Sequence, residues 1–165
     1  MEPNLDRLIL INKPLGWTSF DVVNKLRNKL KIKKIGHAGT LDPLATGLLI
    51  LCTGKMTKRI DEYQAQEKEY TGKFIIGQST ASHDLETEVT EPKDISLITD
   101  EAIHFASHKF KGVIQQVPPL HSAIKVDGKR AYKLARKGKE VELKPREVTI
   151  LDFEITRIQK PEISF

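Results

Sequence analysis

Apolar residues along this chain occur in short runs separated by polar segments, and the spacing of these runs predicts both strands and helices. Residues 7–13 (RLILINK) and 47–52 (GLLILC) are apolar runs of strand length. Between them, Val22, Val23, Leu26 and Leu30 would lie on one face of a helix. Thr18 or Ser19 would cap that helix, since a hydroxyl can accept a hydrogen bond from its first backbone N–H groups.

The second half of the chain adds more strands than helices. Residues 100–110 have helical spacing, with Asp100 as the expected N-cap, and residues 131–137 predict a short basic helix closed by Gly138. Strands are expected at residues 68–77, 112–117, 121–126 and 146–156, with a turn at Asp127 and Gly128. Because strands outnumber helices and rarely alternate with them, we expect an α+β fold with a mixed, mostly antiparallel sheet and flanking helices.

Length and charge narrow the range of partners. A chain of 165 residues can bury a real core, and its length suggests a single domain. Lys and Arg outnumber Asp and Glu by 27 to 22, a bias that favours a polyanionic partner, although solvated charge would explain it as well. The basic residues cluster in segments 25–34 and 125–139, as expected of a groove that follows phosphates.

Several classes of protein fit the sequence poorly. The single cysteine, Cys52, allows no internal disulfide and is expected to be an inert core thiol. The first residues lack the features of a signal peptide, and no apolar stretch approaches the length of a membrane span. We therefore expect a cytoplasmic protein with no membrane function.

The sequence contains no convincing motif for binding a metal ion or a nucleotide. His104 and His108 have the i, i+4 spacing of zinc ligands, but no glutamate lies between them, and a solvated helix face is the better interpretation. One cysteine cannot supply the zinc site of nucleobase deaminases. Residues 53–58 (TGKMTK) lack the glycine spacing of a phosphate-binding loop, and Met56 stands where magnesium would need a hydroxyl. We expect no metal and no cofactor.

The most informative segment is residues 36–49, GHAGTLDPLATGLL. Its three glycines permit backbone angles or close approaches that a side chain would forbid, and Pro43 fixes the backbone directly after Asp42. Because a buried strand follows, we expect Asp42 at the entrance to a sheet core, partly shielded from water. Asp42 could cap the turn at residues 44–47 through its side chain, or it could carry chemistry.

This segment resembles the motif of the bacterial tRNA pseudouridine-55 synthases, the TruB family, almost letter for letter. Residues 13–27 (KPLGWTSFDVVNKLR) are similar to the family's N-terminal motif, and residues 68–77 (KEYTGKFIIG) to its tyrosine-bearing strand. Residues 117–141 are similar to its next signature. The resemblance spans roughly residues 8–156 and implies a pseudouridine synthase fold that acts on the T-arm of tRNA without a cofactor.

The resemblance also implies roles for individual residues. Asp42 would be the catalytic carboxylate, either attacking C1′ of the target uridine or removing the C2′ proton, two routes that the sequence leaves open. Tyr70 would stack on the flipped base and assist proton transfer, although by itself it could be a half-buried strand tyrosine with an exposed hydroxyl. His37 would fill the position that the base vacates. Phosphate contacts are expected from Lys13, Lys58, Lys125, Arg130 and Arg136.

Two departures from the family pattern qualify this expectation. In residues 79–87 (STASHDLET), Ala81 and Ser82 replace the usual Thr-Asp-Thr-like stretch, while Asp84 is kept. The sequence ends at PEISF, without the family's Lys-Gly-Thr-Tyr-Ile-Arg motif, whose arginine pairs with the catalytic aspartate. We therefore expect residues 1–165 to form a partial catalytic domain that is monomeric at full length. The alternative is a non-catalytic RNA-binding or tRNA-folding module.

Overall fold

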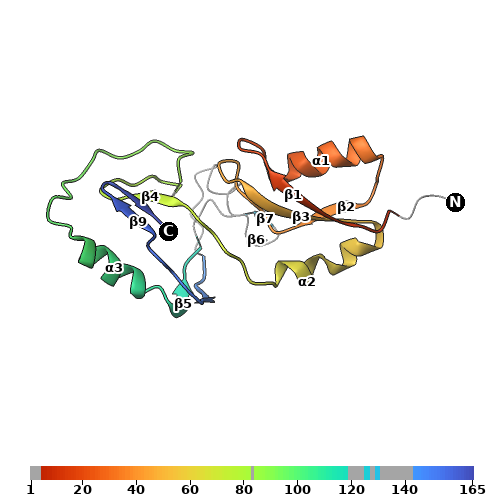
Figure 1. Cartoon of the computed structure of the whole chain (residues 1–165). Coiled ribbons are helices and arrows are strands. Elements are labelled where there is room, and N and C mark those ends of the chain that lie inside the picture. Colours follow the sequence, from red (N-terminus) through yellow and green to blue (C-terminus); the bar gives the residue numbers. More distant parts are fainter. Residues whose placement is uncertain (1–4, 83, 119–124, 127–128, 131–142) are drawn as a thin grey trace. The chain divides into compact units, whose positions relative to one another are not determined.

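Contacts within the chain divide it into two compact units, Met1–Glu69 and Tyr70–Phe165 (Figure 1). The structure is a computed structural model, and it describes residues 5–82, 84–118, 125–126, 129–130 and 143–165. The expectation that residues 1–165 form a single catalytic domain stays a prediction.

The first unit is built on a three-stranded antiparallel sheet. Its strands are β1 (Leu8–Lys13), β2 (Ile35–Ala38) and β3 (Gly47–Thr53), in the order β1-β3-β2. The central strand β3 supplies two of the core side chains, Leu49 and Leu51, which are 1% and 0% exposed. The register pairs Lys13 with Gly47, so the end of β1 lies beside the residue that closes the segment around Asp42.

One helix covers the core of this sheet. Helix α1 (Ser19–Leu30) packs Val22 and Val23 into the same cluster of buried residues as Leu49 and Leu51. Thr18 is its N-cap, which confirms one of the two caps that the sequence offered. The Thr18 hydroxyl accepts from the Asp21 N–H at 3.1 Å, and the Asp21 carboxylate accepts from the Thr18 N–H at 2.9 Å. Hydrogen bonds from Thr18 lower the pKa of Asp21.

Two short helices complete the first unit. The 3₁₀ helix η1 (Gly54–Arg59) follows β3 directly and leads into α2 (Ile60–Gln64). Cys52, at the end of β3, is 0% exposed, and burial raises the pKa of its thiol. The sequence prediction of a core thiol is thus confirmed.

In its described residues, the second unit combines one helix with small antiparallel sheets. The sheets pair β4 with β10 and β10 with β9, β5 with β8, and β6 with β7. The elements are β4 (Lys73–Ile75), α3 (Asp100–His108), β5 (Gly112–Gln116), β6 (Lys125–Val126), β7 (Lys129–Arg130), β8 (Arg146–Ile150), β9 (Arg157–Gln159) and β10 (Glu162–Ser164).

Three boundaries in this unit differ from the sequence predictions. The N-cap of α3 is Thr99, whose hydroxyl accepts from the Ala102 N–H at 3.2 Å, and Asp100 is the first helical residue. Strand β4 is much shorter than residues 68–77. Strand β8 stops at Ile150 because Phe153 turns inward against other aromatic rings, with its centroid 6.1 Å from that of Phe110.

Two further predictions fall partly outside the described residues. The predicted turn at residues 127–128 lies outside them, as does the predicted helix at residues 131–137 with its closing Gly138. Of the strand expected at residues 121–126, the structure describes only β6.

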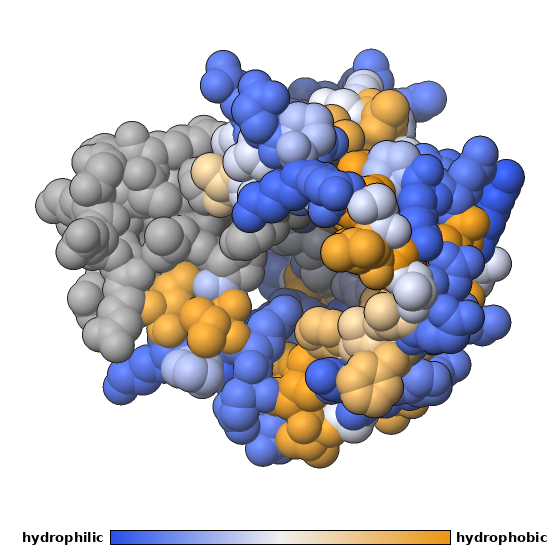
Figure 2. Space-filling model, turned by 90° about the vertical axis from the view of Figure 1, so that its left-hand side faces the viewer, coloured by the Kyte–Doolittle hydropathy of each residue, from blue (hydrophilic) through white to orange (hydrophobic). Residues whose placement is uncertain are grey.

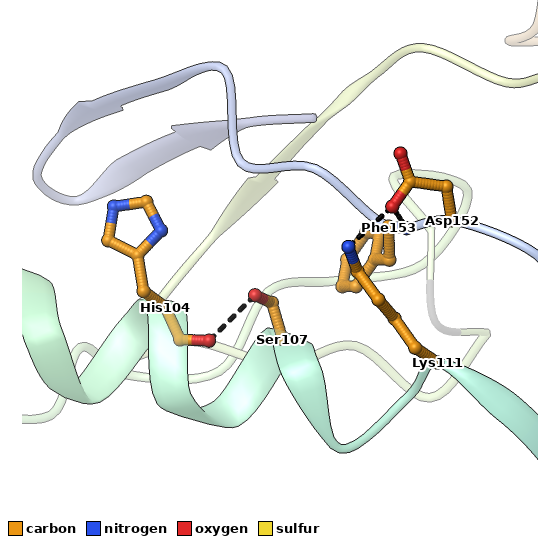
Figure 3. A network of polar contacts seen from close by, with 5 residues as sticks. All are labelled: His104, Ser107, Lys111, Asp152 and Phe153. Atoms are coloured by element: carbon orange, nitrogen blue, oxygen red, sulfur yellow. Dashed lines mark hydrogen bonds and ion pairs between the residues drawn. The ribbon is translucent and has the colours of Figure 1, made fainter.

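Polar contacts join the end of α3 to the segment after β8 (Figure 3). Lys111 forms an ion pair with Asp152 at 2.5 Å, and the same carboxylate accepts from the Phe153 N–H at 2.9 Å. The Lys111 hydrogen bond is the main cause that lowers the pKa of Asp152. Within α3, the Ser107 hydroxyl donates to the His104 carbonyl at 2.8 Å. These contacts fix the chain where Phe153 enters the interior.

An apolar hollow of about 500 Å³ opens beside α3. Its lining includes Phe74, Ile103, Phe110 and Phe153. Figure 2 shows patches of apolar surface between hydrophilic side chains on one face of the molecule. No helix in the described part of the chain is long and apolar enough to cross a membrane.

Candidate active site

The segment that carries Asp42 is held from the start of α1. Ser19, the first residue of the helix and 2% exposed, contacts both backbone groups of Leu41. Its hydroxyl accepts from the Leu41 N–H at 2.9 Å and faces the Leu41 carbonyl at 3.1 Å. One buried side chain therefore fixes the residue immediately before Asp42.

Lys13 holds the residue immediately after Asp42. Its side chain is 0% exposed, and its ammonium donates to the carbonyls of Pro14 at 2.9 Å, Trp17 at 2.5 Å and Pro43 at 3.4 Å. The Pro43 carbonyl also accepts from the Gly16 N–H at 2.8 Å. Burial lowers the pKa of the Lys13 ammonium, while the Asp42 and Asp21 carboxylates act in the opposite direction.

This placement of Lys13 differs from the phosphate contact expected from the sequence. A side chain that is 0% exposed, with carbonyl partners, does not face a polyanion in solution. Lys13 instead joins the loop after β1 to the segment of Asp42. The physical reason is its register position at the end of β1, opposite Gly47, which points its long side chain beneath the loop rather than outward.

The glycines of this segment perform the roles that the sequence predicted. Gly39 and Gly47 have φ angles of 98° and 125°, a region that residues with a Cβ rarely adopt. The Gly47 N–H donates to the Asn12 side-chain oxygen at 3.1 Å, so β1 also holds the far end of the segment. The backbone around Asp42 is therefore fixed at both ends and on both sides of the aspartate.

The Asp42 carboxylate itself is exposed. The flanking residues Leu41 and Pro43 make the inward contacts, which leaves the aspartate side chain on the outer side of the loop and less shielded than the sequence suggested. Within the described residues its carboxylate accepts no hydrogen bond, so the side-chain cap of residues 44–47 is not formed. Only the Asp42 carbonyl is used there, accepting from the Ala45 N–H at 3.0 Å.

His37 lies close to Asp42 in sequence, on β2. The residue is half-buried and pairs with Leu51 of β3. Its Nδ1 faces the Gly39 carbonyl, which can only accept, so Nδ1 carries the proton and donates. Because Gly39 belongs to the same loop as Asp42, this hydrogen bond orients the imidazole relative to the loop backbone.

The remaining predicted site residues are spread over both units. Lys58 is exposed in η1 of the first unit. Tyr70 is the first residue of the second unit and is 64% exposed. Lys125 and Arg130 are paired in the register of β6 and β7, and Arg136 lies outside the described residues. Across the described part of the chain, no group of three or more His, Cys, Asp and Glu could hold a metal ion.

The unusual loop at residues 79–87 is organised by Ser82. This residue is 9% exposed, and its hydroxyl donates to the Asp84 carboxylate at 2.5 Å and lies 2.8 Å from the Thr87 hydroxyl. The same Asp84 oxygen accepts from the Glu86 N–H at 2.9 Å. The serine that departs from the family pattern thus joins Asp84 in a closed network.

Sequence reasoning missed two residues that position the site. Ser19 was considered only as a helix cap, and Asn12 was not singled out. Their contacts with Leu41 and Gly47 span 22 and 35 residues along the chain. No local pattern signals such pairs, since they depend on the register of β1 against β3 and on where α1 begins.

Replacing Lys13 with methionine tests its positioning role. The change keeps the apolar stem, but it leaves the Trp17 carbonyl without its donor and removes one of the two donors to the Pro43 carbonyl. We expect the free energy of unfolding to fall by about 1–3 kcal/mol. Urea denaturation measures this loss, with Lys25→Met on the exposed side of α1 as the control. Equal stability of the two variants would contradict the role.

Sequence comparisons show which protein family this chain resembles. Residues 27–165 match the N-terminal domain of TruB family pseudouridylate synthases. The tRNA pseudouridine synthase B of Flavobacterium johnsoniae is 54% identical over 166 residues, covering 96% of this chain and 72% of the relative. The protein of the same name from Parabacteroides distasonis is 53% identical and covers 94% of this chain and 69% of the relative.

Solved structures support the fold. A Cbf5-Nop10-Gar1 complex matches 95% of this chain and 37% of its own, with a TM-score of 0.61 and 23% identity. An H/ACA RNP bound to a substrate RNA containing 2′-deoxyuridine matches 99% of this chain and 42% of its own, with a TM-score of 0.62 and 20% identity. At these identities the likeness concerns the fold, and it confirms the expected α+β class.

Proposed function

This chain belongs to the TruB family of pseudouridylate synthases, and from that premise we propose that it isomerises uridine 55 in the T-loop of tRNA to pseudouridine, with Asp42 as the catalytic carboxylate. The observation that carries the assignment of Asp42 is its placement. Its backbone is fixed through Leu41 and Pro43, while its carboxylate is exposed and accepts no hydrogen bond within the described residues. A group that must meet one atom of a substrate needs both properties.

The proposed reaction is an isomerisation, so it consumes no oxidant, reductant or second substrate. The bond between N1 and C1′ breaks, the freed base rotates, and a bond between C5 and C1′ forms. C5 loses its proton, and N1 gains one. Asp42 acts on the ribose, either by attacking C1′ and later leaving, or by removing the C2′ proton and returning it. Both routes use the same exposed carboxylate, and both stay open.

The neighbouring residues would expose and hold the target nucleotide. A uridine within a folded loop must leave its stack before its sugar can be reached. We assign to His37 the position that the base vacates, since its ring is oriented by the Gly39 carbonyl close to Asp42 in the chain. Tyr70, 64% exposed, would stack on the flipped base and assist proton transfer.

Contacts with tRNA phosphates are assigned to Lys58, Lys125, Arg130 and Arg136. Lys58 is exposed in η1, which contacts β2 and β3. Lys125 of β6 is the register partner of Arg130 of β7. We further propose that residues 1–165 belong to a catalytic domain that acts on the T-arm in the cytoplasm, and that the full-length protein is a monomer.

The direct test is product formation on a defined tRNA. The chain is incubated with an unmodified tRNA transcript and with a matched transcript carrying cytidine at position 55. We expect pseudouridine at position 55 of the first transcript and none in the second, measured by nuclease digestion and mass spectrometry. Binding of the first transcript without any product, both by this chain and by a version extended through the motif that carries the paired arginine, would overturn the enzymatic proposal and favour the non-catalytic RNA-binding module.

A further inference from the structure

Positive charge in this chain is concentrated in one part of the sequence. Between Asp21 and Asp61 there are nine Lys and Arg residues and a single acidic residue, Asp42. The whole chain, by comparison, has a net charge of +5. The proposed catalytic carboxylate is thus surrounded in sequence by a segment more basic than the protein as a whole.

The fold brings two parts of this segment together. The Gly54 N–H donates to the Lys34 carbonyl at 2.9 Å, and Ile35 is the register partner of Thr53. The loop between α1 and β2 therefore lies against the start of η1. This contact makes neighbours of Lys33 and Lys34, on one side, and Lys55, on the other, although 20 residues separate the two groups in sequence.

These three lysines are exposed, and within the described residues none of them forms an ion pair. Asp6 lies nearby, where its carboxylate accepts from the Lys55 backbone N–H at 2.6 Å. In the same part of the chain, Arg59 does form an ion pair, with Glu62 at 2.8 Å. The lysine ammonium groups therefore remain available to an external anion.

Complementing the helix dipole does not account for these lysines. Basic residues in the last turn of a helix stabilise its negative end, and Arg27 and Lys29 occupy that turn in α1. Lys33 and Lys34 lie beyond the C-cap at Lys31, and Lys55 is in the first turn of η1. Their common feature is their position beside β2, the strand that carries His37.

We propose that Lys33, Lys34 and Lys55 form a phosphate-binding strip that holds the RNA backbone next to the nucleotide stacked on His37. This proposal rests on the proposed function, and it adds a second point of contact between the protein and the RNA. Strand β2 connects the two directly, since it begins at Ile35, right after Lys34, and includes His37. Phosphate contacts of this kind set the register of the RNA and carry no sequence information.

The salt dependence of RNA binding tests the strip. The full chain and its Lys33→Gln/Lys34→Gln/Lys55→Gln variant are titrated with an unmodified tRNA transcript at several salt concentrations. Each lost phosphate contact reduces the slope of log K against log salt by about 0.7 to 0.9. The variant is expected to show a slope smaller in magnitude by about 2 to 3, together with weaker binding at low salt.

Two matched variants serve as controls. Lys33→Arg/Lys34→Arg/Lys55→Arg keeps the charges and should keep the slope. Lys93→Gln/Lys109→Gln/Lys144→Gln removes three exposed lysines of the second unit and should also keep it. Thermal melting of every variant checks folding. An unchanged slope in the strip variant, or an equal loss in the second-unit variant, would overturn the strip.

Failure of the strip is distinguishable from failure of the proposed function. If the wild-type chain forms pseudouridine while the strip variant binds like the wild type, the strip is wrong and the function stands. If the strip variant shows a smaller slope of log K against log salt but the wild-type chain forms no pseudouridine, the strip stands as an RNA-binding surface and the enzymatic proposal falls.

Discussion

Replacing Asp42 with asparagine is expected to lower pseudouridine formation by about a thousandfold or more, because the amide can neither attack C1′ nor remove a proton. The change is nearly isosteric, and within the described residues the carboxylate accepts no hydrogen bond that asparagine would lose. The main interaction lost is the attraction between the Asp42 carboxylate and the Lys13 ammonium, so stability should fall by no more than about 1 kcal/mol. Single-turnover assays on a tRNA transcript, with thermal melting in parallel, measure both effects.

The control for this prediction is another exposed acid of the same unit. Glu67→Gln removes one negative charge from an exposed position outside the loop and should leave the rate near that of the wild type. Binding of tRNA by the Asp42→Asn variant should match or exceed that of the wild type, since a negative charge near the RNA is lost. Residual activity within tenfold of the wild type would refute the assignment of Asp42.

Replacing Leu51 with alanine is expected to lower the free energy of unfolding by about 2–5 kcal/mol. Leu51 is 0% exposed at the centre of the three-stranded sheet, where its side chain packs with Val22 and Val23 of α1. Removing it leaves a cavity that the two layers cannot easily close. Equilibrium unfolding in urea, followed by circular dichroism, measures the shift in midpoint.

Leu48→Ala on the same strand provides the contrast. Leu48 is 62% exposed, so its truncation should change stability by no more than about 0.5 kcal/mol. Because Leu51 is the register partner of His37, the core variant should also lose activity at temperatures where the wild type stays folded. Equal effects of the two alanine substitutions would contradict the burial pattern of β3.

The loop of Asp42 was predictable to the extent that its features are local. A residue other than glycine is sterically strained at a positive φ, so Gly39 and Gly47 indicated directly where the loop turns. The strands β1 and β3 and the helix α1 followed from the spacing of apolar residues. The N-cap of α1 was narrowed to two residues, and hydrogen bonds selected Thr18.

Other sequence predictions failed where long-range packing overrides local preference. The strand expected at residues 146–156 ends early because Phe153 packs edge-on against Phe165, with ring centroids 5.7 Å apart. The resemblance implied a phosphate contact for Lys13, but its side chain is buried. Its burial depends on the carbonyl of Pro43, which is 30 residues away in sequence.

By itself, the sequence indicated the fold class, the family resemblance and the glycines that shape the Asp42 loop, because these follow from residue types and their spacing along the chain. The assignment of Asp42 to catalysis rests on the resemblance and stays a prediction. Only the tertiary structure decided what holds that loop. Ser19 reaches Leu41, Lys13 reaches Pro43, and Asn12 reaches Gly47. It also joined Lys34 to Gly54. Such contacts arise from strand register and helix placement, which fix distances between residues that no local pattern connects.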